Sequence, residues 1–171
     1  MPSSHSSALS FSVRPAQKED LLTILEIYNQ GIEDRIATLE SETKDLNYMG
    51  NWFAQHQGRY TALIIQHEGQ LVGWAALNPY SQRCAYDGVA DLSIYIARDF
   101  RGKGAGSQLL MALEHIAEIN KFYKIILFTF SFNVAGQRLY QKQGYRTVGT
   151  FEKQGVLDGK LIDVMIMEKI L

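Results

Sequence analysis

The stretch from Leu92 to Leu110 constrains the fold most, because it joins a buried strand to an amphipathic helix through a glycine loop. Residues 92–96 form an apolar strand run, and residues 109, 110, 113 and 116 are leucine or isoleucine at helical spacing. The loop between them is Arg101-Gly102-Lys103-Gly104-Ala105-Gly106. Glycines let backbone N–H groups converge at the positive end of the helix dipole, and Arg101 and Lys103 add positive charge. The loop therefore predicts an anion cradle that suits a diphosphate.

Two common phosphate-binding motifs do not fit this loop. The Walker motif needs a lysine followed by serine or threonine after its last glycine, and the dinucleotide motif needs a different glycine spacing. The loop does match Q/R-x-x-G-x-G/A at Arg101, Gly104 and Gly106, which is the acetyl-CoA signature of the GCN5-related N-acetyltransferases. A glycine-rich helix entry without a ligand is the alternative interpretation. The strand before the loop and the helix after it favour a coenzyme A site.

Composition indicates one globular domain. The 171 residues are 46% apolar and 20% charged, and the net charge of -1 gives no overall field that would attract nucleic acid or an anionic membrane. The single cysteine, Cys84, excludes an internal disulfide and fits a reducing compartment. No apolar run reaches membrane-spanning length, and residues 1–10 lack the features of a signal peptide. We expect a cytoplasmic protein with a flexible tail over residues 1–10 and a single domain over residues 11–171.

Hydrophobic periodicity and turn residues predict the other elements. Besides the helix after the glycine loop, we expect helices over residues 18–30 (ending at Gly31), 45–57 and 134–143. Strands are expected over residues 11–14, 60–66, 70–77, 92–96, 124–130, 147–156 and 161–167. Asp158-Gly159 predicts a hairpin turn between the last two strands. This order predicts an α/β fold with a mixed, mostly antiparallel central sheet flanked by helices on both faces.

Moving an acetyl group from a thioester to an amine requires a held cofactor, a neutral amine, a stabilised carbonyl oxygen and a proton for the departing thiolate. The strand over residues 92–96 can pair with the amide-rich pantetheine arm if it separates from the strand over residues 124–130. One backbone N–H of that strand would then point at the thioester carbonyl. Asn133, just ahead of the last helix, can cap that helix and also bind the coenzyme arm; capping alone is the alternative.

Two side chains are candidates for the proton transfers. The phenol of Tyr140 can protonate the thiolate, since its ordinary pKa of about 10 lies only slightly above that of a thiol. A tyrosine packed on the sheet is the alternative. Asp91, at the mouth of the central strand, can accept the ammonium proton through water, and a solvated strand-end charge is the alternative. We expect no metal, because no histidine or cysteine cluster has ligand spacing, and we expect His56, His67 and His115 at the surface.

The chain resembles the phosphinothricin N-acetyltransferase group of the GCN5-related (GNAT) superfamily, including its methionine sulfoximine-acetylating relatives, from Phe11 onward. The matching segments are Ile27-Tyr28-Asn29, Ala37-Thr38-Leu39-Glu40, Trp52-Phe53, Asn78-Pro79-Tyr80, Ala85-Tyr86, Ser93-Ile94-Tyr95-Ile96, the Arg101–Gly106 loop, Asn133, Leu139–Tyr145 and Gly159-Lys160-Leu161-Ile162-Asp163. The resemblance implies the GNAT acyl-CoA N-acyltransferase fold. It also implies that acetyl-CoA is bound by residues Ile94, Tyr95, Ile96, Arg101, Gly102, Lys103, Gly104, Ala105, Gly106 and Asn133.

The resemblance also bears on the acceptor. Relatives carry a glutamate, their proposed base, at the position of Asp91, so this chain has a carboxylate one methylene shorter and a water would have to complete the reach. The acceptor site is expected beside Tyr28, Tyr80, Arg83 and Tyr86, although Ser81-Gln82-Arg83-Cys84 is unlike the family's pocket segment. Homodimers are common in the family, so a homodimer is expected.

We therefore expect an acetyl-CoA-dependent N-acetyltransferase that acts on the amine of a small amino acid-like acceptor of the phosphinothricin or methionine sulfoximine type. A protein N-terminus or a polyamine is the alternative acceptor, although Arg35 and Arg83 favour an anionic acceptor. A coenzyme A-binding sensor without turnover is the alternative from another class. The glycine loop alone does not separate an enzyme from a sensor.

Overall fold

The computed structural model describes residues 8–171, so residues 1–7 of the expected tail lie outside the described residues. Seven strands form one sheet in the order β1-β2-β3-β4-β5-β7-β6. Their bounds are β1 Ser12–Pro15, β2 Ala62–His67, β3 Gln70–Pro79, β4 Val89–Ile96, β5 Lys124–Phe130, β6 Arg146–Leu157 and β7 Lys160–Ile170. Every neighbouring pair is antiparallel except β4 and β5, which are parallel. The prediction of a mixed, mostly antiparallel sheet is confirmed.

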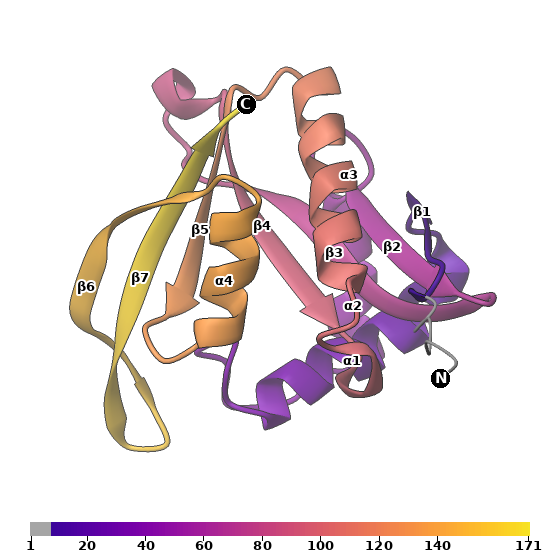
Figure 1. The fold of residues 1–171 in the computed structure, drawn as a ribbon, viewed down its shortest axis with the longest axis horizontal. Helices are drawn as coiled ribbons and strands as arrows, with labels where there is room; N and C mark the ends of the chain where they lie inside the picture. The colour runs from indigo at the N-terminus through magenta and orange to yellow at the C-terminus, as the bar shows by residue number, and fades with distance from the viewer. Residues whose placement is uncertain (1–7) are drawn as a thin grey trace, which may run out of the picture.

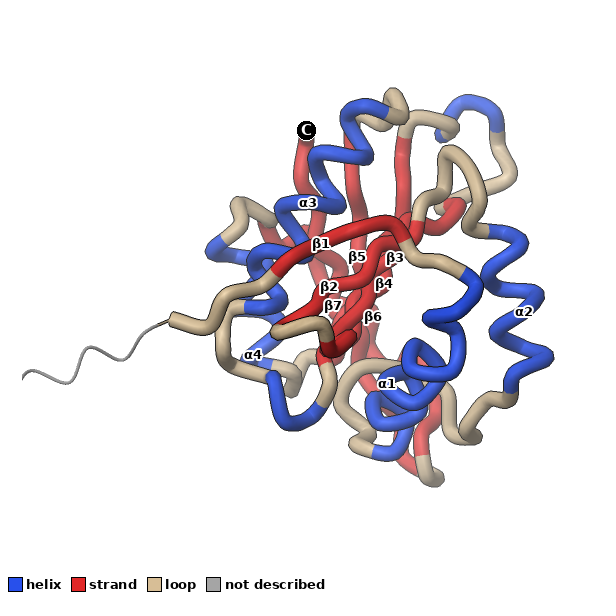
Figure 2. The backbone as a smooth tube through the Cα atoms, turned by 90° about the vertical axis from the view of Figure 1, so that its right-hand side faces the viewer, coloured by secondary structure: helices blue, strands red, loops and turns tan. Residues whose placement is uncertain are grey.

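Helices cover both faces of the sheet, as predicted (Figures 1 and 2). On one face lie α3 (Ala105–Ile119) and α4 (Val134–Lys142), and on the other lie α1 (Leu21–Glu33) and α2 (Leu46–Gln55). Leu109, Leu110 and Leu113 of α3 are fully buried in the first core cluster, which confirms the apolar stripe read from the sequence. Short 3₁₀ turns occupy Lys18–Asp20, Cys84–Tyr86 and Arg98–Phe100. No helix among residues 8–171 is long and apolar enough to cross a membrane.

The sheet opens between β4 and β5. These strands pair at only three positions, where residues 89–91 lie opposite residues 124–126. Beyond that point β4 continues along β3 and β5 continues along β7, so the two strands diverge, and α4 lies over the gap (Figure 1). The separation of the two strands, which pairing of residues 92–96 with a pantetheine arm requires, is therefore present. Among residues 8–171, the backbone groups on that edge of β4 beyond residue 91 have no strand partner, so they can pair with a ligand.

The predictions for Gly31 and His56 are wrong. Gly31 does not end the first helix, which continues to Glu33. A Cβ at Gly31 would lie 2.7 Å from Cδ1 of Tyr95, so this glycine allows close packing of α1 on β4. His56 is not a surface residue but is 7% exposed, with its ring stacked on Trp52. The hairpin turn is confirmed, because Asp158 and Gly159 both adopt positive φ, 48° and 75°.

Candidate active site

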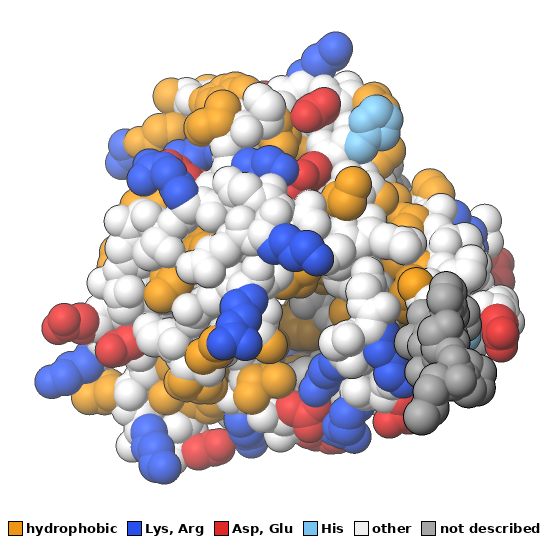
Figure 3. Space-filling model, viewed as in Figure 1, with side chains coloured by type: hydrophobic (Ala, Val, Ile, Leu, Met, Phe, Trp, Pro, Cys, Tyr) orange, Lys and Arg blue, Asp and Glu red, His pale blue; other side chains and the backbone are white. Residues whose placement is uncertain are grey.

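A cavity of about 590 Å³ occupies the gap between β4 and β5 and extends to the N-terminus of α3. Figure 3 shows a hollow on this face of the molecule with lysine or arginine side chains beside it. Most of the residues that we expected at the cofactor site or in catalysis line this cavity, namely Asp91, Ile94, Tyr95, Ile96, Arg101, Gly102, Gly104, Gly106, Asn133 and Tyr140. The topology therefore gathers residues from four separate segments around one cavity.

The glycine loop presents backbone N–H groups to one end of the cavity. Gly102 and Gly104 have φ of 73° and 91°, a conformation that side chains with a Cβ rarely adopt, and Gly104 is the N-cap of α3. The first N–H groups of a helix have no partner within the helix. Gly106 is needed for another reason, because a Cβ there would lie 3.1 Å from Leu139 of α4. Positive φ and close helix packing together leave backbone N–H groups at the positive end of the α3 dipole, where an anion could bind.

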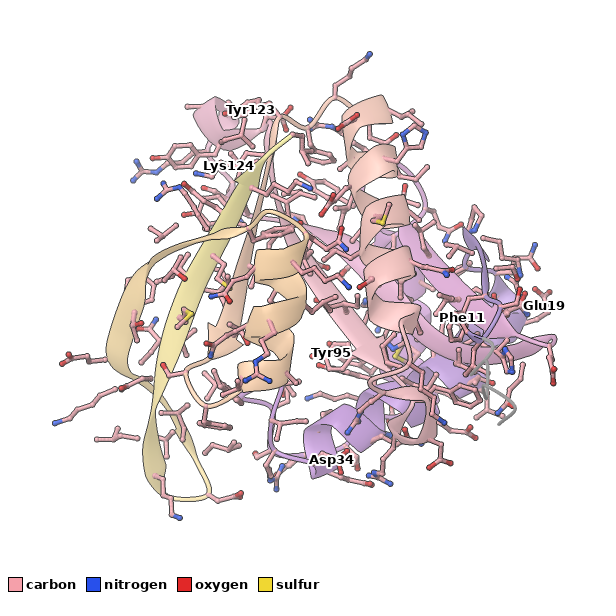
Figure 4. All side chains as sticks on the ribbon, in the orientation of Figure 1. Phe11, Glu19, Asp34, Tyr95, Tyr123 and Lys124 are labelled. Atoms are coloured by element: carbon pink, nitrogen blue, oxygen red, sulfur yellow. The ribbon has the colours of Figure 1, made fainter. Side chains whose placement is uncertain are left out.

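Arg101 does not serve the cradle as a free cation, which corrects one part of the prediction. Its guanidinium donates to Asp34 Oδ2 at 2.6 Å and to the carbonyl oxygen of Ile96 at 3.1 Å. Arg98 also donates to Asp34, at 2.7 Å and 3.2 Å. Hydrogen bonds from Arg98 and then Arg101 hold the pKa of the Asp34 carboxyl below its usual range. Asp34 lies at the end of α1 (Figure 4), so this cluster ties the loop to α1 and to β4.

Two other loop residues do not line the cavity. Ala105 is 1% exposed and belongs to the core under α3. The Lys103 side chain is exposed, and its ammonium lies 5.4 Å from the centre of the Phe100 ring. The structure thus assigns Ala105 to packing. Lys103 can contribute charge only from outside the cavity.

Sequence reasoning missed two cations that do line the cavity. Arg138 and Lys142 occupy successive turns of α4, four residues apart, and so share one face of the helix. Neither forms a salt bridge with any carboxylate in residues 8–171, so their charge is free to face an anionic ligand. Their i, i+4 spacing beside Tyr140 was the signal in the sequence. It is a weak signal, because such a pair is common on solvent-facing helices.

Asn133 takes the capping role expected of it. Its Oδ1 accepts from the Gly136 N–H at 3.1 Å, and its Nδ2 donates to Thr129 Oγ1 at 3.3 Å. The side chain lines the cavity, so a coenzyme arm lying in the gap would pass beside it. The cap fixes the start of α4 at the edge of the gap.

Asp91 lies where β4 and β5 stop pairing, and its side chain lines the cavity. Burial disfavours the charged carboxylate and raises its pKa to about 7, while the Leu92 backbone N–H lowers it by less. Within residues 8–171, no lysine or arginine forms an ion pair with it. A carboxylate in this state can accept a proton at neutral pH, whereas an ordinary aspartate is too weak a base.

Tyr140 of α4 lines the same cavity as Asp91 and Tyr95. It is 8% exposed, and burial, with smaller contributions from Tyr95 and Asp91, raises the pKa of its phenol. No group in residues 8–171 forms a hydrogen bond with its hydroxyl, although the ring lines the cavity. The ring also packs edge-on against Tyr145 at 5.9 Å. A neutral phenol with a free O–H inside the cavity can donate a proton to a thiolate that forms there.

The four residues expected at the acceptor site do not meet at the cavity, although the rings of Tyr80 and Tyr86 lie 6.0 Å apart. Tyr28 is 8% exposed and packs edge-on against Trp74 and Tyr95, so it is a core residue. Tyr80 and Tyr86 are 41% exposed, and neither they nor Arg83 line the cavity. Arg35 likewise turns away and pairs with Asp158 at 2.9 Å. Aromatic residues in a loop gave no indication of where that loop lies relative to the gap.

The family model of the Acetyltransferase (GNAT) family matches residues 23–145, which include both sides of the cavity. The chain belongs to the GNAT acetyltransferase family. The resemblance read from the glycine loop is therefore confirmed. In this GNAT fold, the opening between β4 and β5 and the loop before α3 form one continuous site.

Three relatives refine this placement. The L-methionine sulfoximine/L-methionine sulfone acetyltransferase of Pseudomonas paraeruginosa is 29% identical over 162 residues, 94% of each chain. A phosphinothricin acetyltransferase of Sinorhizobium meliloti, solved in complex with acetyl-CoA, is 26% identical with a TM-score of 0.90, over 95% of this chain and 89% of that one. A ribosomal-protein-alanine N-acetyltransferase of Brucella melitensis is 30% identical with a TM-score of 0.90, over 94% and 99%. This GNAT acetyltransferase is therefore related to the phosphinothricin and methionine sulfoximine acetyltransferases.

Proposed function

We propose that this chain transfers an acetyl group from acetyl-CoA to the amine of a small amino acid-like acceptor of the phosphinothricin or methionine sulfoximine type. One observation carries the proposal: the half-buried carboxylate of Asp91 lies where β4 and β5 separate, in the same cavity as Tyr140. A proton acceptor and a proton donor thus face the same gap. A protein that only bound coenzyme A would not require this pair.

The residues present fit acetyl-CoA. The N–H groups of the Gly102–Gly106 segment suit its diphosphate, with Arg138 and Lys142 beside them. The unpaired edge of β4 over residues 92–96 suits the two amides of the pantetheine arm, and Asn133 lies on the opposite side of the gap. When bound, acetyl-CoA supplies an activated acyl group and a thiol leaving group.

The chain's own residues would manage the protons. Asp91 takes one proton from the acceptor ammonium through a water, which leaves a neutral amine able to attack the thioester carbonyl carbon. A backbone N–H of β4 donates to the carbonyl oxygen as negative charge develops on it. As the new C–N bond forms and the C–S bond breaks, Tyr140 protonates the sulfur and recovers a proton from the attacking nitrogen. The products are an N-acetyl compound, coenzyme A as a thiol, and a proton released from Asp91.

The acceptor is tested by following thiol release from acetyl-CoA with a panel of amines. The panel contains methionine sulfone, methionine sulfoximine and phosphinothricin, a polyamine, and a peptide that begins with alanine. The proposal expects the highest kcat/KM with an amino acid-like compound. A preference for the peptide would instead support the activity named for the Brucella relative, and an absence of release with every amine would support a coenzyme A-binding sensor.

We also propose that the chain forms a homodimer and acts in the cytoplasm. Two large apolar side chains at the β6–β7 edge of the sheet, Val156 (61% exposed) and Leu161 (57%), lie directly opposite each other in the strand pairing and so share one face of the hairpin. A second copy that covers this hairpin face would remove them from water. Cys84 is free and exposed, which suits a reducing compartment.

A further inference from the structure

Behind the cavity wall, a buried histidine is linked to a serine of the cavity by a chain of hydrogen bonds. His56 follows α2 directly, and its Nδ1 lies 2.7 Å from the carbonyl oxygen of Trp52. Its Nε2 lies 2.9 Å from Oδ1 of Asn78 in β3. Asn78 Nδ2 in turn donates to Ser93 Oγ in β4 at 2.9 Å. Three side chains from three elements thus form one relay.

This relay ends beside Asp91. Ser93 and Asp91 are two residues apart in β4, so their side chains point to the same face of the sheet, and both line the cavity. Asn78 lies directly opposite Asp91 in the antiparallel pairing of β3 with β4. Because His56 is 7% exposed and its ring is stacked on Trp52, it has little freedom to move. The relay therefore fixes the position of the Ser93 oxygen relative to the carboxylate.

Ser93 keeps hydrogen-bonding capacity toward the cavity. A hydroxyl has one donor and two acceptor sites, and the Asn78 amide occupies one acceptor site. If the Asn78 amide were turned by 180°, its nitrogen would donate to His56 and its oxygen would accept from the Ser93 hydroxyl. At least one acceptor site of the Ser93 oxygen would still be free in that orientation. The Cα atoms of residues two apart on a strand are separated by about 7 Å. One water spans about 5 Å between two side-chain oxygens, so it bridges this pair when the longer Asp91 side chain leans toward Ser93.

We propose that Ser93 and Asp91 together hold the water that takes the proton of the acceptor ammonium; this proposal rests on the proposed function. His56 and Asn78 fix the position of Ser93 so that it can bind this water. The water donates one hydrogen to Ser93 Oγ and the other to the Asp91 carboxylate, which leaves a lone pair for the ammonium. When the ammonium proton moves to the water, a water proton moves to Asp91. Ser93 is not consumed and changes no charge.

This arrangement explains how a short carboxylate can serve in place of a longer one. The side chain of aspartate is one methylene shorter than that of glutamate, so a water has to span the remaining distance to the amine. Ser93 gives that water a second anchor, and water held by two or three partners is typical of buried polar sites. His56 and Asn78 are positioning residues, since neither lines the cavity.

The first test uses the ligand-free protein and a matched pair, Ser93→Thr and Ser93→Val, which differ only in the hydroxyl and suit a strand equally. The carboxyl of Asp91 is titrated by carbon-13 NMR in both variants. The proposal predicts a higher pKa in Ser93→Val, because the carboxylate loses the hydrogen bond of a held water. The same pKa in both variants would overturn the proposal. This readout does not depend on the chain being an acetyltransferase.

The second test is kinetic. Ser93→Val should lower kcat with the preferred amine about tenfold relative to Ser93→Thr, which corresponds to one hydrogen bond, with the KM for acetyl-CoA unchanged. In an Asp91→Glu background, where the longer side chain reaches the amine directly, the same replacement should have almost no effect. An equal loss in both backgrounds would contradict the proposal. His56→Phe should reproduce part of the loss, and His115→Phe, at an exposed position on α3, should not.

If the parent protein acetylates no amine, the proposed function fails. The titration of the Asp91 carboxyl in Ser93→Thr and Ser93→Val still decides whether Ser93 holds a water beside the carboxylate. The two failures are therefore distinguishable.

Discussion

At the residue scale, the burial of Asp91 has a consequence for stability. The folded protein holds this carboxyl with a pKa of about 7, whereas an exposed aspartate has a pKa of about 3.9. At a pH between these two pKa values, the Asp91 carboxyl is protonated in the folded protein but ionised in the unfolded chain. The stability that this group contributes is therefore present below about pH 4 and is lost as the pH rises to about 7.

Asp91→Asn should accordingly stabilise the protein at high pH. The amide carries no charge to bury, so the free energy of unfolding at pH 8 should rise by about 2–4 kcal/mol, with little change below pH 4. Urea unfolding of parent and variant at both pH values measures this difference. Asp99→Asn, at an exposed position, is the control and should change little. Equal stability of parent and Asp91→Asn at pH 8 would mean that Asp91 is solvated.

Tyr140 provides the second residue-scale prediction. Its hydroxyl forms no hydrogen bond with residues 8–171, so Tyr140→Phe removes no protein contact and should fold normally. Turnover should fall about 100-fold, because the proton for the thiolate is missing. Affinity for acetyl-CoA should stay the same, as measured by calorimetric titration. Turnover at the parental rate would make Tyr140 a packing residue only.

At the scale of elements, the junction between the glycine loop and α3 is the most sensitive part of the cofactor site. Gly104→Glu places a carboxylate where the N–H groups converge, and acetyl-CoA binding should become undetectable by calorimetric titration. Gly104→Ala is the matched control, since it carries the strain of a Cβ at positive φ without the charge. The alanine variant should bind more weakly than the parent but measurably. Unchanged affinity in Gly104→Glu would remove this loop from the cofactor site.

The sequence predicted those elements whose signals are local. Glycine spacing identified the loop before α3, and Asp158-Gly159 identified the β6–β7 turn, because both depend on backbone conformation that few residues adopt. The partners of Arg101 could not be predicted, since Asp34 is 67 residues away in the chain. For the same reason His56 was expected at the surface, although it meets Asn78 across 22 residues of sequence. Long-range contacts such as these decide which polar side chains a fold buries.

At the scale of the whole molecule, the exposed hairpin face predicts how the chain associates. Val156→Asp and Leu161→Asp place charge on that face, and each should shift a dimer toward monomer in sedimentation velocity. Met111→Asp, which alters an equally exposed apolar residue on α3, is the control and should leave the dimer intact. If the parent protein sediments as a monomer at micromolar concentration, the hairpin face is not a dimer interface.

The central claim is that the opening between β4 and β5 is a site where Asp91 removes a proton from an amine. The most direct measurement is the pH dependence of kcat/KM for the amine in the parent, Asp91→Asn and Asp91→Glu. In the parent, kcat/KM should rise as the pH increases through about 7. In Asp91→Asn, kcat/KM should be about 100-fold lower at pH 8, and this loss should shrink at higher pH, where free amine becomes abundant. Asp91→Glu should keep or increase the activity of the parent. Three superimposable curves would contradict the account and leave the proton to bulk solvent.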